Sequence, residues 1–392
     1  MATALVARWR CAGRLTGRRG RKDAFDLIEA DVSASHNQGD EVMNEKFPFS
    51  KVLAGLMCAA GLICSHAATA AALPKVTMMV GGIDKQIYLP YSLAQNLGFF
   101  KKYGIDMELS TEQAGGVGAE DAMISGQVDM AGAWYVHTID FQQHGKAVLD
   151  IVQLSGAPGE REMCATKSGV KTPADWKGKV VGVTDVGSGT DDLTLYLAAR
   201  YHLGLHDFSR IGVGAGPTLI GALKHDRIAC GMTTQPTVNA IEKMKVGYSA
   251  IDLATADGVK KWLGGYWPTA AVLARTDWVK AHPKETQAVV NAMVATMRWI
   301  NTHSAAQIAD HLPADFVSNQ LSTKDEYVKA LTMDKGQFLP DGLMPQDGPQ
   351  TVLAVEKFAG KISKPVNLDV TYTNEYAIKA NAMLAKEGDA GK

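Results

Sequence analysis

The sequence predicts an α/β protein with two lobes, because short apolar segments alternate with amphipathic ones twice along the chain. The first series covers residues 75–133 and the second covers residues 179–232. A strand–helix–strand order that repeats in this way is typical of a parallel sheet covered by helices. Two stretches, Ala122–Trp134 and Ala222–Thr234, also resemble each other, since in each a helix ends in a polar turn before a short apolar strand. This repeat favours two similar lobes over one long sheet.

Each element of the first series follows from its residues. Short apolar runs bounded by glycine or polar turns predict buried strands. Apolar residues at helical spacing from Leu89 to Phe100 predict a helix that ends at Gly104. The expected elements are strand Lys75–Gly81, helix Tyr88–Tyr103, strand Ile105–Ser110, helix Ala119–Ser125 and strand Val128–Ala133.

The second series has the same order and leads into a helical C-terminal part. An apolar run near residue 270 predicts a strand that returns from the second lobe. The expected elements are strand Lys179–Thr184, helix Asp191–His202, strand Ser209–Gly214, helix Thr218–Lys224, strand Arg227–Met232, strand Pro268–Ala274, and helical segments at Val289–His303, Glu326–Leu331, Pro349–Ala359 and Tyr372–Leu384.

These elements predict a domain organisation with two connections between the lobes. We expect residues 73–162 to form the first part of lobe 1 and residues 163–266 to form lobe 2. Residues 267–392 would then return to lobe 1 and add the C-terminal helices. Two crossover segments of this kind predict a hinge with a cleft between the lobes.

The N-terminal residues show the pattern of a secretory signal peptide rather than of a folded domain. Within residues 43–72, Lys46 and Lys51 precede the apolar run Val52–Cys64, which is short for a membrane span. Small residues then predict cleavage near Ala72. Residues 1–42 show neither an apolar period nor a motif. We interpret them as the product of an upstream start codon, and a disordered leader is the alternative.

Charge and composition exclude several classes of protein. The 392 residues include 40 basic and 41 acidic side chains, a formal net charge of −1. Such a balance of charges argues against electrostatic binding to nucleic acid or to an anionic membrane. Apolar residues make up 46% of the chain, which is enough for a sizeable core and argues against disorder.

Cysteine and histidine positions predict neither catalysis nor a metal site. No G-x-S-x-G, H-E-x-x-H or Cys/His pattern occurs, and Gly204 interrupts the pair His202 and His206. We therefore expect no enzyme activity, no metal and no cofactor. Cys164 and Cys230 follow the leader in apolar, strand-like contexts. Such cysteines are more often buried and unpaired, and a disulfide in an oxidising compartment is the alternative.

One segment resembles a known family. Pro90–Asp106 (PYSLAQNLGFFKKYGID) resembles the beginning of periplasmic solute-binding proteins of ABC importers, in the nitrate/sulfonate/taurine and thiamine-pyrimidine-binding family. GQVDMAG, KGKVVGVTDVGSGTD and DRIACGMTTQP fit the same family, so the resemblance covers about Lys75–Asn301. It implies a two-lobed, type II-like periplasmic binding protein fold. The sequence departs from the family pattern at Gln235, where many relatives have an acidic residue, and at Arg227–Cys230. These departures affect the expected ligand rather than the expected fold.

The strongest candidate for a ligand contact is GSGTD at Gly187–Asp191. It follows a predicted strand and begins a helix, so Gly189 and the N–H groups of the first turn would face an anion, with hydroxyls from Ser188 and Thr190. A simple helix cap is the alternative, and the family resemblance favours the ligand contact. We expect one of Asp191 and Asp192 to cap the helix and the other to face water. If either carboxylate pointed into the cleft, it would favour an amine or an aminopyrimidine as the ligand.

Further candidates lie at predicted strand ends and hinges. Gly115 and Gly116 form the counterpart loop in lobe 1. Aromatic rings at such positions can sandwich an organic ligand, although packing in the core is the alternative for each. The remaining ligand-binding candidates are Tyr88, Trp134, Tyr266 and Trp267, with polar contacts from Thr234 and Gln235.

Together these patterns predict a monomeric substrate-binding component of an ABC importer in the periplasm. It would capture a small organic anion, a sulfonate or carboxylate, by hinge closure and deliver it to a membrane permease. A binder of a pyrimidine or similar heteroaromatic molecule is the main alternative. A pyrimidine-synthase-like enzyme and a periplasmic sensing lobe are further alternatives, and no nucleic-acid partner is expected.

Overall fold

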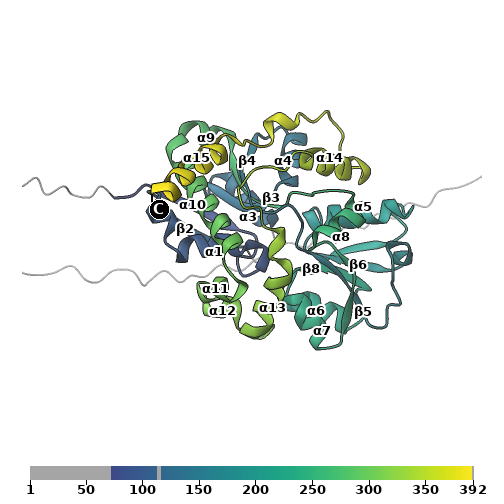
Figure 1. The fold of residues 1–392 in the computed structure, drawn as a ribbon. Helices are drawn as coiled ribbons and strands as arrows, with labels where there is room; N and C mark the ends of the chain where they lie inside the picture. Colours follow the sequence, from purple (N-terminus) through teal and green to yellow (C-terminus); the bar gives the residue numbers. More distant parts are fainter. Residues whose placement is uncertain (1–71, 113–115, 391–392) are drawn as a thin grey trace, which may run out of the picture. The chain divides into compact units, whose positions relative to one another are not determined.

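The structure, a computed structural model, describes residues 72–112 and 116–390. Apart from Ala72, the predicted leader and signal peptide lie outside the described residues. The chain forms two five-stranded sheets, each with helices packed on it (Figure 1). We call the first sheet with its helices lobe 1 and the second lobe 2, and both belong to one unit, Thr69–Lys392. No helix among the described residues combines the length and apolar composition that crossing a bilayer requires.

The sheet of lobe 1 has the strand order β2-β1-β3-β10-β4. β1 pairs in parallel with β2 and β3, whereas β10 runs antiparallel to β3 and β4. All residues of β3 are buried, as expected for a central strand with both faces covered. The strands are β1 (Lys75–Val80), β2 (Asp106–Thr111), β3 (Met130–Trp134), β4 (Val148–Gln153) and β10 (Ala270–Arg275).

The sheet of lobe 2 has the equivalent order β7-β6-β8-β5-β9. β6 pairs in parallel with β7 and β8, and β5 runs antiparallel to β8 and β9. The two stretches that resemble each other in the sequence end in β3 and β8, which occupy the central position of their sheets. The strands are β5 (Arg161–Ala165), β6 (Val180–Val183), β7 (Ser209–Gly212), β8 (Cys230–Thr233) and β9 (Gly247–Asp252).

The helices cover both faces of the sheets, with α5 to α8 on lobe 2 and most of the others on lobe 1 (Figure 1). They are η1 (Gln86–Tyr88), α1 (Leu89–Asn96), α2 (Phe99–Lys102), α3 (Gly116–Ser125), α4 (Val136–Gln143), η2 (Pro173–Trp176), α5 (Gly189–Arg200), α6 (Pro217–Lys224), α7 (Thr237–Lys243), α8 (Ala256–Leu263), α9 (Thr276–Ala281), α10 (Pro283–Thr302), α11 (Ala305–Asp310), α12 (Ala314–Val317), α13 (Lys324–Asp334), η3 (Lys335–Gln337), α14 (Gly348–Phe358), η4 (Leu368–Val370) and α15 (Glu375–Ala390).

Three expectations about the elements need correction. The sheets are mixed rather than parallel, because the first strand after each passage between the lobes, β5 or β10, runs antiparallel to its neighbours. The helix expected over Tyr88–Tyr103 is divided, since Gly98 has a φ of 71° and ends the first part. Strands β4 and β9 were not predicted, because polar residues interrupt their apolar runs.

Two crossover segments join the lobes and lie side by side. The first follows β4 and the second precedes β10. Backbone bonds link them, from Trp267 N to Gly156 O at 3.1 Å and from Thr269 N to Ser155 O at 3.2 Å. The hydroxyls of Ser155 and Thr269 lie 2.6 Å apart, and Thr269 also donates to Ala157 O at 2.5 Å. The two connections are therefore hydrogen-bonded to each other where the chain passes between the lobes.

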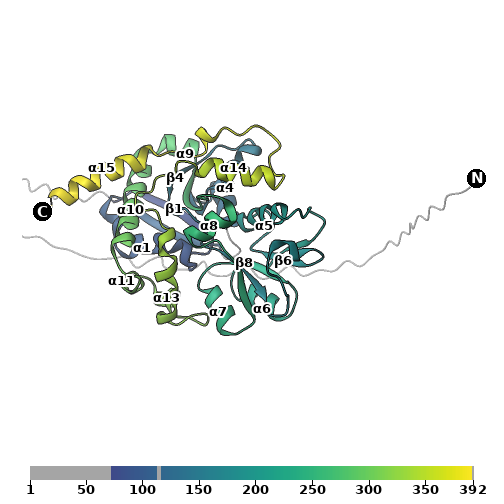
Figure 2. The same ribbon diagram turned by 45° about the vertical axis from the view of Figure 1, so that its right-hand side comes forward.

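Helix α14 adds a connection that the sequence did not predict. It lies beside both α4 of lobe 1 and α5 of lobe 2 (Figure 2). On the lobe 2 side, the rings of Phe358 and Tyr196 meet edge to face with centroids 5.8 Å apart. On the lobe 1 side, the Oε1 atom of Gln143 accepts bonds from the N–H groups of Ser363 and Lys364 at 3.0 and 2.8 Å. This helix thus spans the two lobes.

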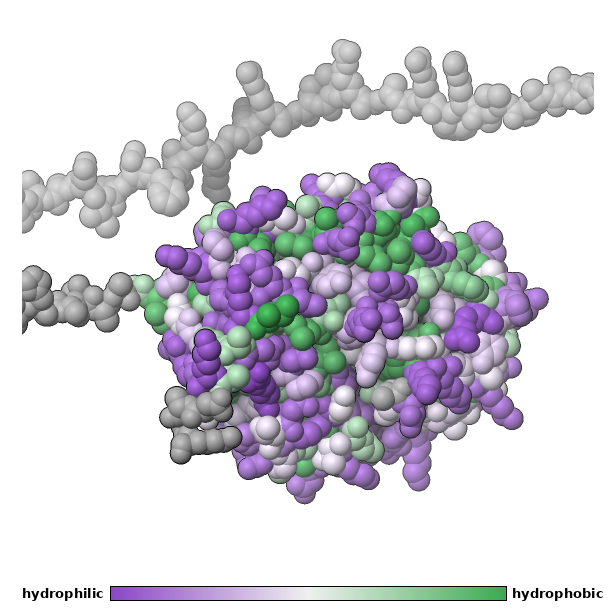
Figure 3. Space-filling model, turned by 45° about the horizontal axis from the view of Figure 1, so that its top comes forward, coloured by the Kyte–Doolittle hydropathy of each residue, from purple (hydrophilic) through white to green (hydrophobic). Residues whose placement is uncertain are grey.

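The surface seen in Figure 3 is mainly hydrophilic, with apolar areas between the polar ones. Large apolar side chains that are more than half exposed include Val186, Tyr266 and Phe358. Scattered apolar side chains of this kind are normal on a folded protein.

Cys164 and Cys230 form a disulfide, so the expectation of two separate buried thiols was wrong. The residues lie directly opposite each other on the antiparallel strands β5 and β8. The sequence did not reveal this, because the local pattern around each cysteine says nothing about which strands are neighbours.

Replacing both cysteines, as Cys164→Ala with Cys230→Ala, should lower the free energy of unfolding by about 2–4 kcal/mol, because the crosslink restricts the unfolded chain. Denaturant unfolding of the oxidised wild type and of the double variant measures the difference. A reductant should destabilise the wild type and leave the double variant unchanged. Equal stability of the two proteins would contradict the disulfide.

Candidate functional site

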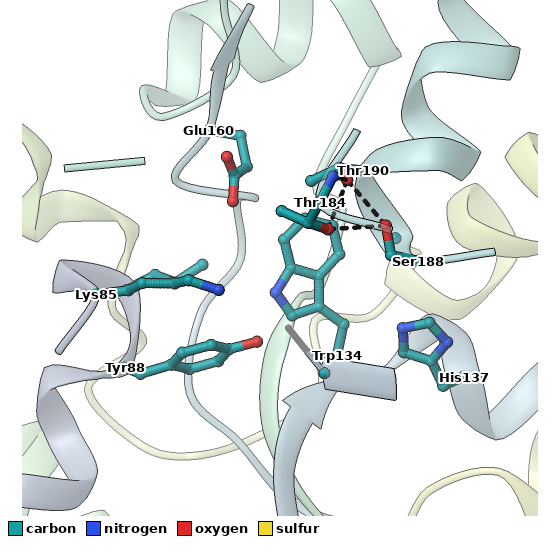
Figure 4. A pocket seen from close by; sticks show the side chains of 11 residues that line it. Lys85, Tyr88, Trp134, His137, Glu160, Thr184, Ser188 and Thr190 are labelled. Atoms are coloured by element: carbon teal, nitrogen blue, oxygen red, sulfur yellow. Dashed lines mark hydrogen bonds between the residues drawn. The ribbon is translucent and has the colours of Figure 1, made fainter. Parts of the chain in front are cut away.

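A small cavity lies between the lobes, where β3 and β6 end (Figure 4). Its volume is about 20 Å³, enough for about one water molecule. Lobe 1 and the first crossover line one side, and the loop after β6 with the start of α5 lines the other. The lining residues are Lys85, Ile87, Tyr88, Gly116, Trp134, His137 and Glu160 on the first side and Thr184, Ser188, Gly189 and Thr190 on the second.

The lobe 2 side consists of a hydroxyl cluster at the N-terminus of α5. The side-chain oxygens of Thr184, Ser188 and Thr190 lie 2.9 Å from one another. Ser188 donates to Asp185 O at 2.7 Å, and Thr190 Oγ1 accepts from Thr184 N at 3.0 Å. These bonds hold the loop in place, while the positive end of the helix dipole faces the cavity. Ser188 occupies the N-cap position of α5, but its side chain accepts no hydrogen bond from the backbone of the first turn, so the simple helix cap that the sequence offered as the alternative is not formed.

The lobe 1 side brings a lysine and a carboxyl group together. The ammonium group of Lys85 donates to Gly81 O at 2.9 Å, and in Figure 4 it points toward the indole of Trp134. Burial raises the pKa of Glu160 to about 8, although nearby Lys85 acts in the opposite direction. Burial likewise lowers the pKa of Lys85, against the effect of Glu160. In both groups burial thus favours the uncharged form, and the opposite charge of the neighbour favours the charged form.

Trp134 lies between the two sides of the cavity. Its ring packs edge to face on Trp267, with centroids 5.6 Å apart. Gly189 lies directly against the indole, since a Cβ atom built at this glycine would stand 2.0 Å from Trp134 Cε3. The start of α5 can approach the ring so closely only because residue 189 has no side chain.

The cavity contains six of the ten ligand-binding residues that the sequence suggested, and four lie elsewhere. Tyr88, Gly116, Trp134, Ser188, Gly189 and Thr190 line it. Trp267 lies behind Trp134, and Thr234 is buried but does not line the cavity. Gln235 binds across the lobes, since its backbone oxygen accepts from Gln86 N at 3.1 Å. Tyr266 is 61% exposed and lines a separate cavity of about 530 Å³. Gly115 lies outside the described residues.

We expected one of the two aspartates of α5 to face water, but both have partners within the protein. Asp191 accepts from Gly187 N at 2.8 Å and pairs with Arg210. Asp192 is fully buried and pairs with Lys361. Neither lines the cavity, so neither opposes an anion there by direct contact.

Five lining residues were missed by the sequence analysis: Lys85, Ile87, His137, Glu160 and Thr184. Lys85 and Ile87 lie in the loop between the first predicted strand and helix, a position that could have drawn attention. Glu160 belongs to a crossover whose path the sequence does not reveal. Nothing distinguishes His137 in the sequence.

Comparison with known proteins identifies the class to which this fold belongs. The two-lobed fold is that of periplasmic binding proteins. It matches the alkanesulfonate-binding protein SsuA from Xanthomonas axonopodis pv. citri bound to MOPS, with a TM-score of 0.60 and 17% identity over 78% of this chain and 99% of that one. A solved structure from Bordetella bronchiseptica RB50 is more similar, with a TM-score of 0.73 and 31% identity over 79% of this chain and 98% of that one.

The chain belongs to the NMT1/THI5-like family, whose sequence profile matches residues 87–333. The nitrate/nitrite binding protein NrtA from Nostoc sp. is a curated relative, 25% identical over 257 residues, or 59% of this chain. The match covers 56% of that relative, so the chain spans little more than half of its length.

The contact between Gly189 and Trp134 allows a matched pair of variants. Gly189→Ala should lower the free energy of unfolding by about 1–3 kcal/mol, because the new methyl group displaces the indole. Gly221→Ala on α6 is the control, since a Cβ atom there meets nothing within 4 Å. Thermal unfolding and tryptophan emission measure both. Equal behaviour of the two variants would contradict the close approach.

Proposed function

We propose that the protein is the substrate-binding component of an ABC importer and captures a small organic anion, a sulfonate or carboxylate, between its lobes. The observation that carries the proposal is the cavity itself, which is lined by Lys85 of lobe 1 and by the N-terminus of α5 in lobe 2, with the indole of Trp134 between them in Figure 4. Both groups attract negative charge, and each lobe contributes one of them. An anion between them gains its full stabilisation only when the lobes are together.

The cavity volume supports capture by hinge motion. Space for about one water molecule does not accommodate an organic ligand, so binding requires the lobes to separate and then close. A micromolar affinity corresponds to a binding free energy of about 8 kcal/mol. For a ligand of about ten heavy atoms, this is roughly half of the largest binding free energy per atom that small ligands reach. Contacts from both lobes make such an affinity attainable.

The relatives and the disulfide support the same function and location. NrtA from Nostoc sp. is a nitrate/nitrite binding protein, and SsuA from Xanthomonas is an alkanesulfonate-binding protein. A disulfide between Cys164 and Cys230 is typical of an oxidising compartment. We therefore propose export to the periplasm with cleavage near Ala72, and delivery of the ligand to a membrane permease.

Glu160 supports a second candidate ligand, a pyrimidine or similar heteroaromatic molecule. Its buried carboxyl group is the one acidic side chain among the described residues that line the cavity. A ring N–H donor could bond to it while the ring lies against Trp134. A thermal-shift screen of the full chain against alkanesulfonates, carboxylates, nitrate and pyrimidines separates the two candidates. If no compound in these classes changes the unfolding temperature or the tryptophan emission, the proposed ligand classes are wrong.

For an organosulfonate found in that screen, Lys85→Met should weaken binding by about 1.5–3 kcal/mol, the value of one charge-assisted hydrogen bond. Ser188→Ala with Thr190→Ala should weaken it as well, because it removes the hydroxyl groups nearest the helix N-terminus. Lys102→Met is the control, since Lys102 is an exposed residue paired with Glu387. Isothermal titration calorimetry measures all four proteins. Unchanged affinity in Lys85→Met would refute the anion site.

Affinity for the same sulfonate should fall as the pH rises from about 7 to about 9. A sulfonate stays ionised throughout, whereas Glu160, with its pKa raised to about 8, gains a negative charge beside the ligand. Because the pKa of Lys85 is lowered, loss of its proton acts in the same direction. Glu160→Gln should make the pH dependence shallower. An affinity that increases with pH would contradict the assigned roles.

A further inference from the structure

Three carboxylates outside the cavity come together where the lobes meet. Asp140 lies on α4 of lobe 1, Asp192 on α5 of lobe 2, and Glu356 on α14, which spans the two. One carboxylate oxygen from each lies within 4.8 Å of the other two. This group, here called the acidic cluster, therefore unites three elements that are far apart in the sequence.

The acidic cluster has too little positive charge among its described neighbours. Lys361 pairs closely with Asp192, but its ammonium nitrogen is 3.9 Å from both Asp140 Oδ2 and Glu356 Oε2. Glu356 is completely buried, and neither of its oxygens has a hydrogen-bond partner among the described residues. The Oδ2 atom of Asp192 lacks one as well. One ammonium group thus faces three carboxylates. One of these carboxylates, the fully buried Glu356, points into the cluster without a hydrogen bond.

The surrounding groups do not supply the missing charge. Arg210 pairs with Asp191, the neighbour of Asp192. His137 lies 3.3 Å from Asp140 Oδ2, but its other ring nitrogen faces a fourth buried carboxylate, Glu120, at 3.6 Å. Buried charges are normally paired or bound to a metal ion.

We propose that Asp140, Asp192 and Glu356 bind a divalent cation of the hard, oxygen-preferring class, such as Ca²⁺, Mg²⁺ or Mn²⁺, and that Lys361 moves toward solvent when the ion binds. Oxygens separated by up to 4.8 Å can share one Ca²⁺ ion at its usual distances of about 2.3–2.6 Å, whereas Mg²⁺, at about 2.0–2.1 Å, requires them to move closer together. An all-carboxylate set favours these ions over zinc or copper. The partly exposed side chains of Asp140 and Lys361 leave a path to solvent.

Such an ion would connect the lobes, because its ligands come from α4 and α5. It would favour the arrangement in which the lobes are together, and by linkage it would raise affinity for a ligand that is bound between them. The site does not depend on which ligand the cavity takes. Its test therefore needs no ligand and can fail while the proposed function holds.

The experiment is calorimetric titration of the chelator-treated full chain with CaCl₂, MgCl₂ and MnCl₂, together with thermal unfolding in each salt. We expect one ion per chain and a higher unfolding temperature. Glu356→Gln and Asp192→Asn, which keep the side-chain shapes, should abolish both effects. Lys361→Met should tighten binding by about tenfold or more, because the competing ammonium group is gone. Asp369→Asn, at an exposed acidic residue, is the control and should behave as the wild type does.

Two results would overturn the proposal. The first is a wild-type protein that binds none of the three ions at millimolar concentration and unfolds at the same temperature with and without them. The second is binding that survives in both Glu356→Gln and Asp192→Asn, which would place the ion elsewhere. Thermal unfolding of each variant in chelator shows whether it is folded, so a loss of binding is not confused with a loss of structure.

Discussion

Hydrogen bonds between the two crossovers determine how the lobes are joined. Ser155 and Thr269 join the two passages between the lobes through backbone and side-chain bonds in a fully buried setting. Buried polar groups of this kind are costly to separate, since each would be left without a partner. The two connections are therefore expected to move together as one hinge, which limits how the lobes can approach each other.

The same crossovers place the chemistry of the cavity. Trp267 in the second crossover supports Trp134, and Glu160 in the first lies near Lys85. Gly189 brings the start of α5 against the indole, so that a helix N-terminus from one lobe and an ammonium group from the other line the same cavity. Charge complementarity across the cavity thus depends on the hinge geometry. Helix α14 bridges the lobes at a second place, where the acidic cluster lies.

Much of the fold was predictable from local sequence, and the part that was not has a common cause. The strands and helices around residues 75–133 and 179–232 follow from apolar spacing and glycine positions. The antiparallel strands β5 and β10, the disulfide and the position of α14 depend on which distant segments become neighbours. No local pattern specifies such pairings.

The residues of the candidate site likewise divide into those that the local sequence predicts and those that it does not. Ser188, Gly189 and Thr190 were recognisable because a glycine-rich turn follows a strand and begins a helix, and Trp134 because it ends a strand. Lys85 was recognisable only as a residue of the loop after the first predicted strand, and Glu160 could not be assigned, since the path of its crossover depends on distant contacts. Tyr266 and Trp267 could not be told apart in the sequence, although Trp267 is fully buried behind Trp134 whereas Tyr266 is exposed and lines a separate cavity.

If groups from both lobes hold a small molecule between them, the position of the molecule can be seen directly in a crystal structure of the protein with a compound selected by binding. We expect electron density for the compound between the ammonium group of Lys85 and the first turn of α5, against the ring of Trp134. Density in the hinge-side cavity lined by Tyr266, or on one lobe alone, would contradict this expectation.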